Sequence, residues 1–170
     1  METTKAIFSR RSVRDFQDKE IPDPVLEGIL EAIRWSPSWA NTQCWEIVVV
    51  KDSSVKEKLK EAVGQNPANR SIAQAPVILV FCYKKNRSGF YHDKESTILG
   101  DWGMFDLGIA TQNAALAAHD AGLGTVVMGL FDHQRISKIL GVPEEVQVVS
   151  MLPVGYSARA GKMPPSRALM

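Results

Sequence analysis

The sequence predicts a single layered domain of the α/β or α+β class. Helical and strand patterns alternate along the 170 residues without internal repeats or low-complexity linkers, which is typical of helices packed on a sheet. This length indicates one domain over residues 1–170, with no room for separate cofactor and substrate domains. Hydrophobic residues make up 45% of the chain and charged residues 23%, a composition typical of packed globular proteins.

The first half of the chain contains helical patterns before and after a strand pattern. Apolar spacing indicates a helix over residues 2–14, then a second that Asp23 caps and that ends at Trp35, with Pro24 at its first position. Residues 47–50 are a continuous β-branched run, which predicts a buried strand. The next elements expected are a helix from Ser53 or Ser54 to Val63, a turn region over 64–69 and a short helix near 71–73.

The second half is centred on one long helix. Residues 77–83 form another predicted buried strand, and the polar residues 84–100 are expected to form a mobile loop or lid. Residues 101–121 show alanine-rich helical spacing and are apolar nearly all round, so this helix is expected to be buried on most sides. The last elements expected are a strand over 125–130, a helix capped by Asp132 and ending at Leu140, and a strand over 147–154.

Charge and hydropathy argue against several functional classes. Twenty basic and nineteen acidic residues leave a formal net charge of +1, which does not favour a nucleic-acid binder. The longest apolar stretch, residues 77–82, is far shorter than the ~20 residues needed to cross a bilayer. Residues 1–5 lack the apolar stretch of a signal peptide, so we expect no membrane partner and a cytoplasmic location.

The cysteines and histidines show no catalytic or metal-binding spacing. Cys44 and Cys82 form no Cys-x-x-Cys pair and are expected to act as small apolar residues in a reducing compartment. His92, His119 and His133 lack ligand spacing with one another and with the cysteines. No metal site is predicted.

A basic cluster, residues 10–14, is the first candidate for chemistry. On a helix, Arg10 and Arg14 would lie four residues apart on one face, with the Ser12 hydroxyl between them. Such a group can bind a phosphate dianion through charge-assisted hydrogen bonds. The alternative is a solvated basic face balanced by nearby acidic residues, which are Asp15, Asp18 and Glu20.

Residues 35–45 join a predicted helix to a predicted strand and are unusual for such a loop. They contain three of the four tryptophans together with serine, threonine, asparagine and glutamine. These polar groups can bind the carbonyls and ring nitrogens of a flat heterocycle, and tryptophan can cover its face. The alternative is a structural loop with buried tryptophans.

A glycine-rich stretch, residues 122–129, does not match a dinucleotide-binding fingerprint. It ends a helix and begins a strand, whereas the fingerprint ends a strand and begins a helix. No Walker A sequence occurs elsewhere. A Rossmann-type or nucleotide triphosphatase site is therefore not supported.

Taken in chain order, these segments resemble the nitroreductase family of FMN-dependent oxidoreductases. The resemblance covers nearly the whole chain, and Cys44 stands where the family pattern has proline. The matching segments are Arg10-Arg11-Ser12-Val13-Arg14-Asp15-Phe16, Ser36 to Trp45, Asn69 before Ala75-Pro76, the alanine-rich helix ending at Gly122-Leu123-Gly124, and Pro164-Pro165-Ser166-Arg167.

The resemblance implies an α+β nitroreductase-like fold, with a central mixed sheet of about four strands flanked by helices. It also implies a homodimer with FMN at the subunit interface, formed around the long helix. The implied FMN contacts are Arg10, Ser12, Arg14 and Arg167 at the phosphate and ribityl end with Arg11 nearby, Pro37, Ser38, Trp39 and Asn41 at the flavin ring with the last two from the partner subunit's side, Asn69 at the pyrimidine edge, and the backbone of Met128 and Gly129 near the reactive nitrogen.

Three departures from the family pattern affect these expectations. Trp39 is bulkier than the small residue common at its position, which would narrow the substrate space over the flavin. Pro165 stands where relatives often carry a basic residue, so the phosphate charge would depend more on the arginines. The sequence ends three residues after Arg167, so the exchange of a C-terminal arm is expected to be reduced.

The function implied is hydride transfer from NADH or NADPH to FMN, then reduction of a nitroaromatic or quinone-like acceptor. Without a second nucleotide motif, donor and acceptor would use one site in turn, by a ping-pong mechanism, and no catalytic side chain is assigned. One alternative is a flavin electron-relay protein reduced by a ferredoxin-type partner, which residues 84–87 could dock. A weaker alternative is a nucleic-acid module that uses the basic patch.

Overall fold

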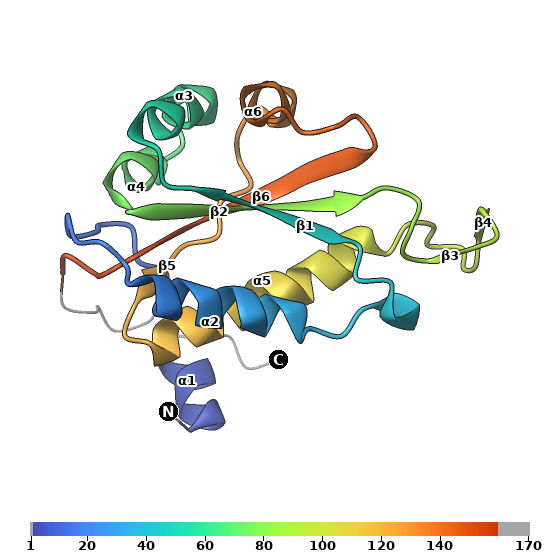
Figure 1. Ribbon diagram of the computed structural model, residues 1–170, viewed down its shortest axis with the longest axis horizontal. Coiled ribbons are helices and arrows are strands. Elements are labelled where there is room, and N and C mark those ends of the chain that lie inside the picture. The colour runs from blue at the N-terminus through green and yellow to red at the C-terminus, as the bar shows by residue number, and fades with distance from the viewer. Residues whose placement is uncertain (1, 160–170) are drawn as a thin grey trace, which may run out of the picture.

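The computed structural model describes residues 2–159 and shows helices on both faces of a four-stranded sheet (Figure 1). The strand order is β1-β2-β6-β5, and all three neighbouring pairs are antiparallel. A parallel element is present only as the single bridge between Ser12 and Thr125, among the residues described. The strands are β1 (Trp45–Val50), β2 (Val77–Lys84), β5 (Gly124–Thr125) and β6 (Val146–Gly155), and a separate hairpin pairs β3 (Phe90–Tyr91) with β4 (Lys94–Glu95).

Two helical layers cover the sheet. Figure 1 shows the first layer, α3, α4 and α6, above the sheet and the second, α2 and α5, below it. The helices are α1 (Thr3–Ser9), α2 (Asp23–Arg34), the short 3-10 helix η1 (Trp39–Asn41), α3 (Ser53–Val63), α4 (Asn69–Gln74), α5 (Gly103–Asp120) and α6 (His133–Leu140).

Strand β2 explains why both layers are needed. Its side chains alternate between two apolar cores, so residues 77–83 are a continuous buried hydrophobic run that ends at the exposed Lys84. Ile78 and Val80 belong to the core that includes residues of α3, α4 and α6, and Leu79 and Phe81 belong to the core that includes residues of α2 and α5. Two-sided burial therefore accounts for the pattern of β2.

Most predicted elements are confirmed, and the exceptions depend on how segments pair in the sheet. The helix predicted over 2–14 ends at Ser9, because residues 10–16 run extended beside the sheet. The strand predicted over 125–130 pairs only at Gly124 and Thr125, with one further bridge at Met128. The strand β1 is an edge strand, so only Val50 of it is buried.

The long helix is also less buried than predicted. One side of α5 packs on the sheet and α2, but Met104 and Phe105 are each 61% exposed in the single chain. No helix in the described part of the chain combines the length and apolar character that crossing a membrane requires.

Candidate functional site

The predicted phosphate-binding residues lie on an extended arm, residues 10–16. The arm is held to the sheet by the Ser12–Thr125 bridge, by a hydrogen bond from Val13 N to Thr125 O (2.9 Å) and by a bridge from Phe16 to Ser157. Side chains alternate in extended chain, so Val13 faces the sheet while Ser12 and Arg14 are exposed on the other side. The helical spacing predicted for Arg10 and Arg14 is therefore wrong, but an extended arm also places Arg10, Ser12 and Arg14 on one side.

Glycine at position 124 allows this arm to approach the sheet. A Cβ atom at Gly124 would lie 2.5 Å from Val13 Cγ2, far inside van der Waals contact. The arm is also fixed at its far end, because Ser71 Oγ donates to Arg14 O (3.0 Å) and Asp15 pairs with Arg70 (2.7 Å). The acidic neighbour Asp15 thus pairs with Arg70 and Arg159 (3.2 Å), and it does not neutralise the arginines of the arm as the solvated-face alternative required.

The arm contains a donor that no residue in the described part of the chain uses. Arg11 Nη1 donates to Arg10 O (2.7 Å), but Arg11 Nε is buried and has no hydrogen-bond partner within the described residues. A buried, unpartnered N–H is costly unless an acceptor reaches it. An anionic ligand beside the arm would supply that acceptor.

The backbone at Met128 and Gly129 is near this arm in the fold, three to four residues after Thr125. The Met128 N–H and C=O both pair with Met151 (2.9 Å each), so that peptide N–H is not available to a ligand. Gly129 is exposed, its N–H has no partner among the described residues, and its carbonyl oxygen lies 3.2 Å from His133 Nε2. Of the two predicted residues, only Gly129 offers a donor.

Asn69, the predicted contact for the pyrimidine edge, begins α4. Its side-chain amide donates both hydrogens to carbonyl oxygens at the end of α3, those of Lys60 and Gly64. Only the Asn69 side-chain oxygen is left for a ligand. The neighbouring Asn66 links this region to the Gly129 segment, because its amide donates to Leu130 O (3.0 Å).

The predicted ring-binding residues 37–41 lie in the loop before β1. The loop is conformationally demanding, since Ala40, Asn41 and Gln43 have φ values of 44°, 54° and 47°. Hydrogen bonds within it connect Gln43 N to Ser38 Oγ (2.9 Å) and Gln43 Nε2 to Asn41 Oδ1 (3.1 Å). Pro37 and Asn41 are exposed, and Ser38 and Trp39 are half-buried.

A residue that the sequence patterns did not single out, Asp106, anchors this loop. It is 1% exposed on α5, and both of its oxygens accept from Trp39 N (3.1 and 3.2 Å). On the same helix Asn113 donates to Ser36 Oγ (2.8 Å). The sequence could have revealed Asp106 as an acidic residue on the apolar face of the long helix. A carboxylate buried there requires hydrogen-bond donors from other segments.

The arm and the ring-binding loop lie at opposite ends of the sheet within one chain, and Met128 lies between them, bridged to Met151 opposite Val80. The loop leads into Trp45, which pairs with Tyr83 at one end of β2, while α4 precedes Val77 at the other end. The eight residues of β2 separate these ends by about 25 Å. Figure 1 shows the same separation, with η1 on the right and α4 and β5 on the left. Arg167 lies outside the described residues.

Comparison with known proteins identifies the family that shares these segments. A family model described as the nitroreductase family matches residues 7–156. The chain belongs to the nitroreductase family. It is 34% identical to the FMN reductase (NAD(P)H) of Bacillus subtilis, with 96% of this chain and 69% of that protein covered. It is 29% identical to the oxygen-insensitive NADPH nitroreductase of Salmonella typhimurium, with 92% and 66% covered.

A solved structure agrees with the fold. The crystal structure of a nitroreductase family protein from Clostridium novyi matches with a TM-score of 0.83 at 25% identity, covering 92% of this chain and 86% of that one. The predicted resemblance, the α+β fold and the prediction of a nitroreductase-type oxidoreductase are thereby confirmed.

The two cysteines of this nitroreductase-family chain are not nucleophiles at neutral pH. Burial, together with Asp106, raises the pKa of Cys44 to about 12, and burial raises the pKa of Cys82 to about 12. They lie in different apolar cores on opposite faces of the sheet. Both therefore remain neutral thiols, as their interpretation as small apolar residues predicted.

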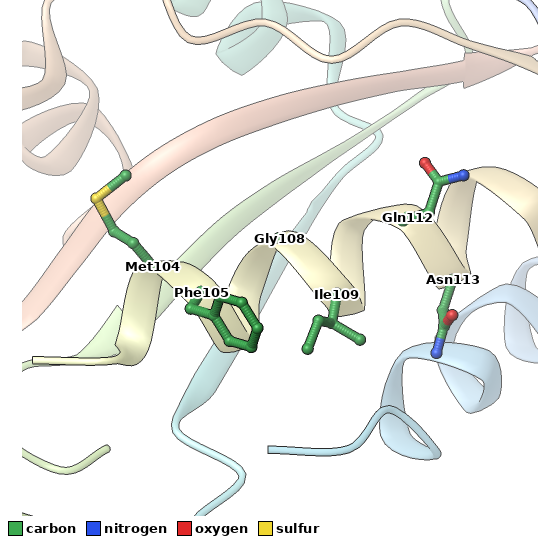
Figure 2. A pocket seen from close by; sticks show the side chains of 6 residues that line it. All are labelled: Met104, Phe105, Gly108, Ile109, Gln112 and Asn113. Carbon is green, nitrogen blue, oxygen red and sulfur yellow. The ribbon is translucent and has the colours of Figure 1, made fainter. Parts of the chain in front are cut away.

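The exposed side of α5 carries an apolar surface, because Met104 and Phe105 are both exposed there. A surface hollow there is lined by side chains of α5 alone, and Figure 2 shows Phe105 and Ile109 projecting from the same side of the helix on successive turns. Gly108 lies between them, with nothing within 4 Å of the position its Cβ would take. A neighbouring helix could approach this surface closely.

Proposed function

We propose that this chain is an FMN-dependent oxidoreductase that takes hydride from NADH or NADPH and reduces a nitroaromatic or quinone-like acceptor. The observation that carries the proposal is the set of ligand-ready donors on the arm and at Gly129. Arg14 and Ser12 are exposed on one side of the arm, Arg11 Nε is buried without a partner among residues 2–159, and Gly129 is exposed with its N–H unpaired within the same residues. Family membership supports a flavin as the ligand, and the Bacillus subtilis relative is named for FMN.

These residues fit FMN in a specific order. The arginines and Ser12 would hold the phosphate and ribityl end through charge-assisted hydrogen bonds. Gly129 N–H would donate to the ring, and the carbonyl of the same peptide, Met128 O, accepts from Met151 N (2.9 Å), which holds this peptide in place. Bound FMN would supply the hydride chemistry, and the protein would supply binding, orientation and a donor at the ring.

A second copy of the chain would complete the site. The ring-binding loop lies about 25 Å from the arm along β2, farther than one flavin ring can span. The helix α5 runs between these two ends, because Asp106 and Asn113 hold the loop and His119 contacts Ser9 just before the arm (2.7 Å). Two α5 helices packed antiparallel about a twofold axis would bring the loop of one chain to the arm of the other. We therefore propose a homodimer with FMN at the interface.

A single flavin site in each half of the dimer would make donor and acceptor bind in turn. The sequence contains no second nucleotide-binding motif, so both substrates would occupy the same ring face. We infer ping-pong kinetics from this shared site. A ternary complex of enzyme, nucleotide and acceptor in stopped-flow experiments would refute it.

The electron-relay alternative draws less support from the structure. In the proposed docking patch, Lys84 pairs with Glu46 (3.0 Å) and Arg87 donates to Thr42 O (3.2 Å), so these groups are partly used within the chain. Anaerobic reduction by a ferredoxin system but not by NADH or NADPH would favour the relay. The two free, buried thiols are compatible with a reducing cytoplasm, which we propose as the location.

The decisive experiment measures FMN retention. The purified protein should be yellow and release FMN on heating in near-equal ratio to chain. Arg14→Ala should weaken FMN binding by about 10- to 100-fold, because it removes a charge-assisted phosphate contact of about 1.5–3 kcal/mol. Arg34→Ala is the matched control, since Arg34 is exposed on α2 and pairs with Glu31. Equal FMN affinity in the two variants would contradict the proposed phosphate site.

A further inference from the structure

The carboxyl group of Asp106 is the most heavily used buried polar group of the ring-binding end. It is 1% exposed and forms no ion pair within the described part of the chain. Its oxygens instead accept from Trp39 N (3.1 and 3.2 Å), Ser88 Oγ (2.6 Å) and Cys44 Sγ (3.8 Å). The carboxyl lies in the first turn of α5, where the helix dipole also favours negative charge.

These donors come from two segments that are far apart in the sequence. Trp39 and Cys44 belong to the loop before β1, and Ser88 lies near the start of the segment 86–102. Ser88 is fully buried, so its hydroxyl contact with Asp106 is shielded from water. Asp106 thus joins the ring-binding loop to a segment that overlaps residues 84–100, the predicted mobile loop or lid.

The segment 86–102 is built around its own hydrogen bonds. Asp101 accepts from Asn86 N and Gly103 N (2.7 Å each), and Trp102 Nε1 donates to Thr97 Oγ1 (2.9 Å). Trp102 N also donates to Ser88 O (3.0 Å), which places the Asp106 contact at the base of the segment. The hairpin of β3 and β4 therefore projects from a fixed base.

The tip of that hairpin touches the ring-binding loop. Tyr91 on β3 packs edge-to-face against Trp39, with ring centroids 5.3 Å apart at 69°. Trp39 is consequently held on both sides, by Asp106 at its backbone and by Tyr91 at its ring. The loop needs such anchors, because Ala40 and Gln43 adopt the left-handed backbone conformation that non-glycine residues disfavour.

We propose that Asp106 is a positioning residue for acceptor specificity. By joining the loop to the base of segment 86–102, it holds Trp39 and Tyr91 together as an aromatic wall beside the flavin ring. This wall would admit small, flat, single-ring quinones and nitroaromatics and exclude acceptors with bulky substituents. The inference rests on the proposed function, and it assigns the selectivity to Trp39 and Tyr91 and their placement to Asp106.

The test compares Asp106→Asn, Ser88→Ala, Trp39→Ala and Tyr91→Ala in the holoenzyme. Ser96→Ala is the matched control, because Ser96 lies in the same segment and its hydroxyl makes no hydrogen bond to the described residues. Hydrogen–deuterium exchange reports on the link itself. Asp106→Asn and Ser88→Ala should speed exchange by about tenfold or more in residues 38–44 and 86–102 and leave β2 and β6 unchanged. Faster exchange throughout the sheet would show a general structural role and overturn the proposal.

Selectivity is measured as the ratio of kcat/KM for para-benzoquinone to that for its di-tert-butyl derivative. Trp39→Ala and Tyr91→Ala should lower this ratio by about tenfold or more, and Ser88→Ala should lower it by a few-fold, with Ser96→Ala unchanged. An unchanged ratio in Trp39→Ala would overturn the proposal.

The two readouts separate this inference from the proposed function. A protein that holds no FMN would refute the proposed function, whereas exchange that is unchanged in Ser88→Ala would refute the Asp106 link with or without flavin. If Asp106→Asn fails to fold, Ser88→Ala and Cys44→Ala still each remove one of the hydrogen bonds to Asp106.

Discussion

The two ends of the sheet form the two halves of the candidate site in different ways. The arginine end consists of an extended arm on which Ser12 and Arg14 are exposed, and its backbone pairs with Thr125 and with the Ser71 hydroxyl. The tryptophan end is a loop whose backbone and side chains are held by one buried carboxyl group, Asp106. The arginine end offers hydrogen-bond donors to a ligand, and the tryptophan end offers a surface whose shape is fixed by hydrogen bonds to Asp106.

This difference shows how the family site divides its tasks. A charged phosphate can be bound by long, exposed side chains, because charge-assisted hydrogen bonds tolerate some freedom. A neutral, flat ring must be recognised by shape, which requires side chains whose positions are fixed by packing. The helix α5 contacts both halves and connects them mechanically within each chain.

Blocking the exposed face of α5 should have the largest effect, because it would disable both halves together. Gly108→Arg places a bulky charge where the proposed partner helix approaches, so the dimer should dissociate. The affinity for FMN should then fall by at least about tenfold. Gly28→Arg is the matched control, since Gly28 is also an exposed helical glycine with open space at its Cβ position. Light scattering after size-exclusion chromatography and flavin absorbance measure the outcome. A Gly108→Arg protein that stays dimeric and yellow would rule out this interface.

Mixing two defective chains tests whether each site takes one half from each chain. Arg14→Ala chains and Trp39→Ala chains, unfolded and refolded together, should form mixed dimers in which one site is intact and the other carries both changes. For random pairing, about a quarter of all sites should recover normal FMN affinity and acceptor selectivity. Each variant refolded alone provides the baseline. Recovery no greater than the mean of the two baselines would mean that both halves come from the same chain.

The arginine end should be sensitive to the packing of its arm. Gly124→Ala would bring a Cβ atom to 2.5 Å from Val13 Cγ2, so the arm must shift and stability should fall by about 1–3 kcal/mol. FMN affinity should fall with it, while the exchange rates of residues 38–44 at the tryptophan end should not change. The double variant Val13→Ala/Gly124→Ala should recover part of the FMN affinity. Denaturant unfolding and flavin titration provide the measurements, and equal FMN affinity in Gly124→Ala and the wild type would contradict this packing role.

The smallest expected effect is a pH dependence at the junction of α1 and α5. Burial, with smaller contributions from Arg10 and Arg11, lowers the pKa of His119 below its ordinary value of 6.5. The unfolded chain therefore binds a proton more readily than the folded one, and the contribution of His119 to stability declines as the pH falls below about 6.5. His119→Gln should show a smaller loss of thermal stability than the wild type between about pH 7.5 and about pH 5.5. The same loss in both proteins would exclude His119 as a source of the pH dependence.

Local patterns in the sequence were sufficient to predict most of the fold. The caps and apolar spacing of α3, α5 and α6 and the continuous run of β2 depend on neighbouring residues, and these elements appear where they were expected. The helix predicted over 2–14 failed beyond Ser9, because pairing with Thr125, which is remote in sequence, holds the arm extended. The strand expected over 125–130 is also much shorter than predicted, since only Thr125 of that range, with the preceding Gly124, pairs continuously with β6.

For the site, the sequence by itself determined which residue types are present and which family pattern they follow. The arginine cluster, the tryptophan-rich loop and the Gly129 segment are short motifs whose chemistry is visible without coordinates. Only the tertiary structure decided that Met128 and Asn69 use their N–H groups within the protein, that Asp106 joins two distant segments, and that the two halves of the site lie at opposite ends of β2. Hydrogen-bond partners and distances across a sheet depend on residues remote in sequence, and no local pattern records them.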